Sequence, residues 1–219
     1  MVNILKVAPS TDPAPNLDEL LCYLKKINNI ADFIHCDVMS SNFVCRDTIN
    51  YKDVKELYLN TICPLDVHLM VDEPYKQIDK YIKAGAQIIS VHYEAFKDKK
   101  TLIKALNKIR KHNLLSGLAI NPDTDVVEIM PYLAYSDLVL VMGVNAGASG
   151  QKYIEATNLK VKKLKQIRDD YGANYYIEVD GGITPDIAKK LKVYGADIVV
   201  SGKFVYFADD KVEAINSLK

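Results

Sequence analysis

The sequence predicts an α/β protein of the (β/α)8 or TIM barrel class, from three observations. Short apolar segments alternate with longer segments in which apolar residues recur at helical spacing. The alternation repeats eight times, and repeated strand–helix units form a parallel sheet. At 219 residues, the chain is close to the minimal length for eight such units. An open doubly wound sheet is disfavoured because no G-x-G-x-x-G follows the first strand.

The expected strands are short apolar runs that end in polar or glycine-containing loops. They cover residues 4–10, 32–39, 64–70, 87–93, 115–121, 137–145, 175–182 and 197–203. The expected helices cover residues 16–27, 51–60, 74–85, 101–113, 124–133, 158–172, 184–195 and 208–219. Pro74 and Pro185 stand at helix starts, where a missing N–H does no harm. Gly85, Gly172 and Gly195 follow helix ends, where a left-handed residue is favoured.

Composition limits the classes of function. Acidic and basic residues balance at 28 each, so neither nucleic acid nor a membrane surface is an expected partner. No apolar run approaches a membrane span, and the N-terminus has no cleavage signal. The four cysteines lack CxxC spacing, which is typical of reduced thiols in a cytoplasmic protein. No linker is visible, so we expect one domain over residues 1–219; a homo-oligomer is left open.

Polar residues at the strand ends point to a site, because TIM-barrel active sites lie at the carboxyl ends of the strands. His35 and Asp37 end the second expected strand, His68 ends the third and Asp180 ends the seventh. Each residue alone has a structural explanation, such as a hydrogen-bonded core histidine or an aspartate that begins a turn. Together, two imidazoles and two carboxylates at one mouth suit a divalent metal. His92 ends the fourth strand, where it lines the cavity or only forms a hydrogen bond.

Glycine-containing loops follow the last three expected strands, in "VNAGASGQKY", "DGG" and "SGK". Glycine lets backbone N–H groups turn around an anion, and the late loops of such barrels commonly hold phosphate. Lys203 would add a positive charge to a bound phosphate. A solvated lysine at the start of the last helix is the alternative interpretation.

Several segments together resemble the ribulose-phosphate 3-epimerase family. They are "VAPS", "HCDVM", "DVHLMV", "VHYEA", "INPDT", "VMGVNAGASGQKYI", "EVDGGI" and "VSGKFVYF", in order over nearly the whole chain. The resemblance implies a TIM barrel, a pentulose 5-phosphate substrate and one divalent metal held by His35, Asp37, His68 and Asp180. Zinc, iron(II), manganese and cobalt all suit this ligand set. Asp37 and Asp180 would also be the two groups that transfer protons.

The same resemblance implies further contacts with the sugar and its phosphate. The candidate substrate contacts are Ser10, Met39, Met70 and Met142, to which we add His92 from its strand-end position. The candidate phosphate contacts are Gly147, Ala148, Ser149, Gly150, Gly181, Gly182, Ser201, Gly202 and Lys203.

The chemistry of epimerisation agrees with this residue set. One group must remove the proton next to the carbonyl and another must return a proton to the opposite face. The pKa of such a carbon acid is roughly 19, against about 4 for a carboxylate, a gap of about 20 kcal/mol. An aspartate alone cannot bridge that gap, so a cation that stabilises the developing enediolate charge is expected.

The chain departs from the family pattern in its first two loops and in part of the phosphate loop. After Ser10 it reads "TDPAPN" where the family continues through an apolar segment, and Ser40-Ser41 and Cys45-Arg46 are also unusual. We expect the reaction type to be retained while the substrate stays open. A hexulose 6-phosphate such as allulose 6-phosphate is the nearest alternative, and a catalytically weak barrel that binds a phosphosugar is another.

Overall fold

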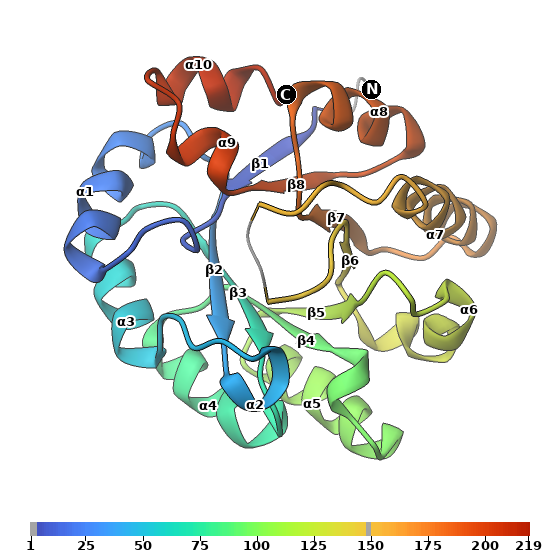
Figure 1. Ribbon diagram of the computed structural model, residues 1–219. Coiled ribbons are helices and arrows are strands. Elements are labelled where there is room, and N and C mark those ends of the chain that lie inside the picture. Colours follow the sequence, from blue (N-terminus) through green and yellow to red (C-terminus); the bar gives the residue numbers. More distant parts are fainter. Residues whose placement is uncertain (1–3, 148–149) are drawn as a thin grey trace.

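Eight parallel strands form the centre of the computed structural model, which describes residues 4–147 and 150–219 (Figure 1). The strands are β1 Lys6–Pro9, β2 Ile34–Met39, β3 Leu65–Met70, β4 Ile88–His92, β5 Leu115–Ile120, β6 Leu138–Met142, β7 Tyr176–Asp180 and β8 Ile198–Ser201. Their hydrogen-bonded order is β1-β8-β7-β6-β5-β4-β3-β2. With helices around this nearly closed barrel, the predicted TIM barrel is confirmed.

Helices occupy every connection between consecutive strands. They are α1 Leu17–Ile27, α2 Ser41–Val44, α3 Tyr51–Asn60, α4 Pro74–Ala84, α5 Lys99–Lys111, α6 Val126–Ile129, α7 Thr157–Tyr171, α8 Pro185–Tyr194, α9 Lys203–Tyr206 and α10 Lys211–Asn216, with 3₁₀ turns η1 Tyr93–Ala95 and η2 Met130–Tyr135. The helix expected over 124–133 is instead α6 followed by η2, because Pro131 cannot supply the N–H that would continue an α-helix.

The predicted helix ends agree with the backbone. Pro74 and Pro185 are the first residues of α4 and α8. Gly85, Gly172 and Gly195 cap α4, α7 and α8 with φ of 101°, 60° and 104°, in the left-handed region. The four cysteines are free thiols. In the described part of the chain, no helix combines the length and apolar character needed to cross a membrane.

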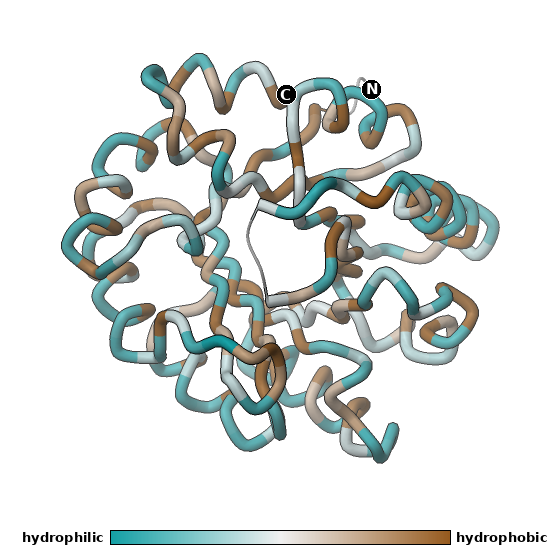
Figure 2. The backbone as a smooth tube through the Cα atoms, in the orientation of Figure 1, coloured by the Kyte–Doolittle hydropathy of each residue, from teal (hydrophilic) through white to brown (hydrophobic). Residues whose placement is uncertain are grey.

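The core has two parts, one on each side of the strands. The larger lies between the barrel and the helices, whose hydrophobic and hydrophilic residues alternate along their turns (Figure 2). The smaller lies inside the barrel and comes mainly from β6, β8 and their neighbours. Its buried members are Ala8, Ile88, Ala119, Leu138, Leu140, Met142, Val144, Ile198 and Val200. Inward positions of β2, β3 and β7 carry the polar residues His35, Asp37, Asp66, His68, Glu178 and Asp180, so polar groups enter the interior from two sides.

The barrel closes weakly between β1 and β2. In the described chain these strands meet at one isolated bridge between Ser10 and His35. Beyond it, side chains complete the hydrogen bonds of β2. Thr11 Oγ1 accepts from the Asp37 N–H (3.2 Å), and Thr48 Oγ1 accepts from the Met39 N–H (2.8 Å) and donates to the Asp37 carbonyl (2.6 Å). The carboxyl end of β2 is therefore fixed although its partner strand has ended.

Gly117 in β5 gives space to Ser90 in β4, its partner in the sheet register. A Cβ at Gly117 would lie 2.0 Å from Ser90 Oγ and 2.8 Å from Ser90 Cα. Because the backbone cannot yield easily, Gly117→Ala should destabilise the protein by about 3 kcal/mol, measured by urea denaturation. The control Gly172→Ala meets no atom within 4 Å. It should lose only the roughly 1 kcal/mol cost of a left-handed alanine; equal losses would contradict the prediction.

Candidate active site

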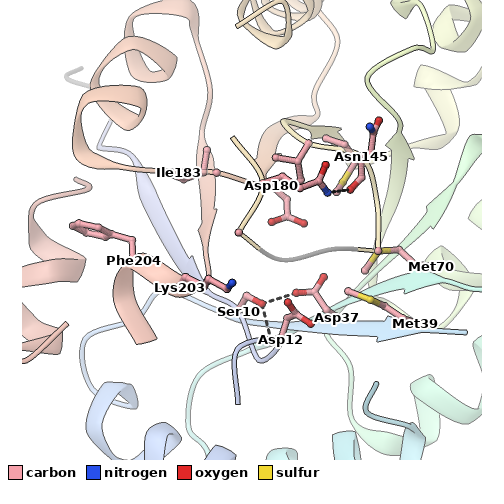
Figure 3. Close-up of a pocket in the computed structure, with 18 of the residues that line it drawn as sticks. Ser10, Asp12, Asp37, Met39, Met70, Asn145, Asp180, Ile183, Lys203 and Phe204 are labelled. Atoms are coloured by element: carbon pink, nitrogen blue, oxygen red, sulfur yellow. Dashed lines mark hydrogen bonds between the residues drawn. The ribbon is translucent and has the colours of Figure 1, made fainter. Parts of the chain in front are cut away.

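A pocket opens at the carboxyl ends of the strands, where the sequence predicted a site (Figure 3). Its walls include the predicted residues Ser10, Asp37, Met39, Met70, Met142, Gly147, Gly150, Asp180, Gly181, Gly182, Gly202 and Lys203. Asp37 and Asp180 extend their carboxyl groups into it from β2 and β7 (Figure 3). The barrel thus brings twelve predicted residues, from position 10 to position 203, to one cavity.

Four predicted metal ligands converge at the floor of this pocket. His35 Nε2 lies 3.5 Å from Asp37 Oδ1 and 3.9 Å from Asp180 Oδ2. His68 Nδ1 lies 3.3 Å and 3.8 Å from the same two oxygens. All four ligand atoms lie within 4.8 Å of one another. The spacing places two nitrogen and two oxygen donors around a common centre.

Three of these donor atoms are buried without a hydrogen-bond partner among the described residues: His35 Nε2, Asp37 Oδ1 and His68 Nδ1. A buried polar atom without a partner is costly, so convergent ones call for an interaction that protein groups do not supply. Mixed imidazole and carboxylate donors are ligands for divalent transition metals. The residues therefore fit a divalent cation.

The strand register explains why these side chains meet. In the β2–β3 pair, Asp37 stands opposite His68, and the alternation of side chains turns both into the barrel. Ser10, just beyond β1, donates its hydroxyl hydrogen to Asp37 Oδ2 at 2.5 Å and accepts from the Asp12 N–H at 3.0 Å. Because Oδ2 of Asp37 is tied to Ser10, Oδ1 is left facing the two histidines.

The two aspartates are driven to opposite protonation states. Burial opposes the ionisation of Asp37, but the charge of His35 and the nearby ring nitrogens of His35 and His68 hold its pKa well below the usual range. Burial and the negative charge of Asp37 raise the pKa of Asp180 to about 8. Without a bound cation, ionisation is therefore favoured at Asp37 and opposed at Asp180. One acid and one base flank the same pocket.

The two histidines also differ. Burial would lower the pKa of His35, but the carboxylates of Asp66 and Asp37 raise it well above its usual value. Burial is the main reason that the pKa of His68 falls to about 4. The raised pKa of His35 reflects the negative field of these carboxylates, which a bound cation would also neutralise.

Beneath His35 lie two carboxyl groups that sequence reasoning missed. His35 Nδ1–H donates to Asp66 Oδ2 at 2.5 Å, and Glu178 Oε1 lies 3.9 Å from the same nitrogen. Burial and the charge of Asp66 raise the pKa of Glu178 well above its usual value. Asp66 and Glu178 stand two residues before His68 and Asp180, so strand alternation was a signal that could have identified them.

His92 lies beside His68 and is fully buried, away from the pocket lining. Its Nε2 is 2.9 Å from His68 Nε2, and its Nδ1 is 3.0 Å from Glu94 Oε2. Burial opposes the ionisation of Glu94, but hydrogen bonds from His92, Thr124 and Asn121 lower its pKa to about 2. The substrate contact predicted for His92 stays a prediction. Glu94 was not among the predicted residues, although it lies in the "VHYEA" segment.

The unusual first two loops meet at the mouth of the pocket. Ser40 is the N-cap of α2, which explains the serine pair after β2. Arg46 crosses from the β2 loop to Asp12 in the β1 loop, with Nη2 2.8 Å from Oδ1. Asp12 lines the pocket and its side chain is buried, whereas that of Arg46 is exposed. This ion pair between distant segments was not predicted.

The expected phosphate side is built around glycines. A Cβ at Gly150 would lie 2.5 Å from Lys203 Nζ, so this ammonium group lies directly against the loop that follows β6. Gly150 and Gly181 have φ of 83° and 110°, which a side chain would oppose. The Ser201 hydroxyl donates to the Ile183 carbonyl at 3.4 Å, and Ser201 is not a lining residue. The candidates Ala148 and Ser149 lie outside the described residues.

Fold and pocket together define a TIM-barrel protein with a cluster of convergent metal-type ligands and a glycine-lined pocket wall. Residues 6–206 match the ribulose-phosphate 3 epimerase family, and the chain belongs to that family. It is 42% identical to the chloroplastic ribulose-5-phosphate-3-epimerase of Arabidopsis thaliana, over 86% of this chain and 66% of that protein. It is 39% identical to ribulose-phosphate 3-epimerase of Bacillus subtilis, over 86% of each chain. The predicted family and isomerase class are confirmed.

Solved structures of other barrels agree in fold. KGPDC from Streptococcus mutans, crystallised as a ligand complex, superposes with a TM-score of 0.76 at 15% identity, covering 98% of this chain and 95% of that one. The 3-hexulose-6-phosphate synthase of Salmonella typhimurium gives 0.69 at 17% identity, covering 98% and 96%. At these identities the likeness concerns the barrel alone.

The cluster should bind one Zn²⁺ per chain, measured by calorimetry. His68→Ala removes a donor and should weaken binding by roughly 100-fold or more, since loss of a ligand's supporting partner alone costs 10–100-fold. His112→Ala is the matched control, because His112 is an exposed residue that caps α5. Unchanged affinity in folded His68→Ala, checked by circular dichroism, would contradict the ligand set.

Proposed function

We propose that this protein is a metal-dependent ketose-phosphate 3-epimerase that interconverts ribulose 5-phosphate and xylulose 5-phosphate. The observation that carries the proposal is the pair of carboxyl groups, Asp37 and Asp180, that enter one pocket from β2 and β7. Inversion of a carbon needs a proton taken from one face and one returned to the other. Relatives named as ribulose-phosphate 3-epimerases at 39–42% identity support the same reaction.

Asp37 and Asp180 would transfer the protons. Asp37 would accept the C3 proton from one face, and Asp180 would deliver a proton to the other; without a bound cation the pKa of Asp37 already lies well below its usual range and that of Asp180 is raised to about 8. In the reverse direction the roles exchange. Ser10 keeps the carboxylate of Asp37 in one orientation through its hydrogen bond. The apolar side chains of Met39, Met70 and Met142 would exclude water from the reacting carbons.

The proposed cofactor is one divalent metal ion held by His35, Asp37, His68 and Asp180. When bound, it would supply the stabilisation of negative charge on the sugar oxygens that carboxylates cannot provide. The unpartnered donor atoms of His35, Asp37 and His68 support this assignment. Zinc, iron(II), manganese and cobalt remain candidates.

The sugar phosphate would be anchored on the side of β6, β7 and β8. Glycines 147, 150, 181, 182 and 202 line that part of the pocket together with Lys203. Backbone N–H groups in such loops and one ammonium group complement a dianion. A cytoplasmic location and self-association stay predictions.

Two alternative functions are distinguished from this one by experiment. Asp12 adds a hydrogen-bonding group to the pocket wall and Arg46 holds it there, so a hexulose 6-phosphate, with one more hydroxyl group to bind, is the alternative substrate. A catalytically weak phosphosugar-binding barrel is disfavoured, since a binder has little need for two opposed carboxyl groups.

Asp37→Asn and Asp180→Asn should each lower the rate of epimerisation by about 10²–10⁴-fold, because each removes a proton-transfer group. Any residual exchange should be restricted to one face of C3. The measurement is deuterium incorporation from D₂O in zinc-saturated protein, with metal content determined in parallel. Asp170→Asn, an exposed aspartate, is the control.

Ribulose 5-phosphate and allulose 6-phosphate should both be assayed. Faster exchange with the hexulose phosphate would replace the proposed substrate by the alternative. No exchange with either, in metal-replete protein, would reject the enzyme assignment.

Lys203→Gln should raise the KM for the sugar phosphate by about 10–100-fold, the value of a charge-assisted hydrogen bond, while kcat changes little. Steady-state kinetics provide both constants. Lys189→Gln removes an exposed charge from α8 and should leave them unchanged. An unaltered KM in Lys203→Gln would place the phosphate elsewhere.

A further inference from the structure

The two metal-facing histidines use different ring nitrogens. His35 turns Nε2 toward Asp37, whereas His68 turns Nδ1 toward it. Each ring therefore directs its other nitrogen into the barrel wall. That of His35 meets Asp66, and that of His68 meets His92. The Asp66 carboxylate orients the His35 ring directly. The His92 ring can orient His68 only if His92 is itself held in one tautomer.

The direction of the hydrogen bonds beside His68 follows from the chemistry of imidazole. A neutral ring has one N–H and one lone pair. For Nδ1 of His68 to bind a cation, its proton must lie on Nε2, which is 2.9 Å from His92 Nε2. His92 then accepts at Nε2 and carries its own proton on Nδ1. That atom is 3.0 Å from Glu94 Oε2, and an ionised carboxylate only accepts.

The other oxygen of Glu94 is fixed by its neighbours. Oε1 accepts from the Asn121 N–H at 2.8 Å and from the Thr124 hydroxyl. The loop that carries both donors is held by the ammonium group of Lys160, which donates to the carbonyls of Asn121, Pro122 and Thr124 at 2.9, 2.6 and 2.5 Å. Glu94 is therefore a rigid acceptor.

We propose that Glu94 is a positioning residue for the metal site, acting through His92 to keep the proton of His68 on Nε2 and Nδ1 free for a cation. Glu94 does not line the pocket, so it would not contact substrate. The inference rests on the proposed cation site for its function. The direction of the hydrogen bonds can be measured independently of that site.

Glu94→Gln tests the proposal because the two side chains have the same shape, while the substitution reverses the direction of the hydrogen bonds that link residue 94, His92 and His68. The Asn121 backbone N–H can only donate, so the glutamine carbonyl stays on that side and its NH₂ faces His92. His92 must then accept at Nδ1 and donate from Nε2. His68 in turn accepts at Nε2 and carries its proton on Nδ1, where it blocks a cation.

The tautomer is read directly by ¹⁵N NMR of histidine-labelled protein prepared without divalent metal. The unsubstituted protein should show the His68 proton on Nε2, and Glu94→Gln should show it on Nδ1. Loss of packing alone would not move the proton between the nitrogens. Finding the Nε2–H tautomer in folded Glu94→Gln would overturn the proposal.

Calorimetric titration with Zn²⁺ provides the second readout. Glu94→Gln should bind about 10–100-fold more weakly, the usual effect of losing a ligand's supporting partner. Glu56→Gln, an exposed carboxyl group on α3, is the matched control and should bind as the unsubstituted protein does. Equal affinity in Glu94→Gln and Glu56→Gln would also overturn the proposal.

His92→Gln separates positioning from packing. Its side-chain carbonyl can accept from His68 Nε2 without the help of Glu94, so affinity should stay within a few-fold of the unsubstituted value. Adding Glu94→Gln to His92→Gln should then have little further effect, whereas additive losses would overturn the proposed route through His92. Failure of the unsubstituted protein to bind Zn²⁺ would reject the proposed cation site instead, and the NMR result would still decide the hydrogen-bond direction.

Discussion

Unpaired polar atoms inside an otherwise apolar barrel are the constraint on which the rest of this structure depends. His35, Asp37 and His68 each hold a buried donor or acceptor without a partner among the described residues. Each such atom costs roughly 1–3 kcal/mol in proteins. Apolar residues such as Leu140 in β6 and Val200 in β8 fill the interior on either side of β7. Folding therefore maintains an arrangement that a ligand, not the protein, completes.

The side chains of His35, Asp37 and His68 stay ordered because the second polar atom of each forms a hydrogen bond. Ser10 binds the second oxygen of Asp37, Asp66 binds the second nitrogen of His35, and His92 binds that of His68. Side-chain hydrogen bonds from threonines also complete the free edge of β2. Each of these hydrogen bonds leaves one donor atom of the side chain directed at the common centre. A few buried hydrogen bonds therefore preorganise a cluster of desolvated polar groups.

Residues that follow the alternation of a strand or the spacing of a helix could be placed from the sequence. Residues in loops and very short elements could not. Alternation along a strand placed His35 and Asp37 on one face, and the barrel rule placed Asp180 at the same mouth. The same alternation reaches Asp66, but Asp66 lies deeper in β3 than the strand end at which the barrel rule places active-site residues. Short elements such as α2 and α9 are too brief for periodicity to reveal. Contacts between loops, such as Arg46 with Asp12, depend on tertiary placement that no local pattern encodes.

The ion pair of Asp12 and Arg46 joins the two unusual loops at the mouth of the pocket, above the four convergent donors. A lone carboxylate beside Asp37 would repel an anionic substrate and make ionisation of Asp180 still harder, an effect that already contributes to the raised pKa of Asp180. Arg46 offsets that charge at 2.8 Å. The pocket wall thus gains a hydrogen-bonding group with little change in net charge. In the proposed function, Asp12 would act on which hydroxyl groups the mouth accepts, whereas the four donors beneath it would determine the chemistry.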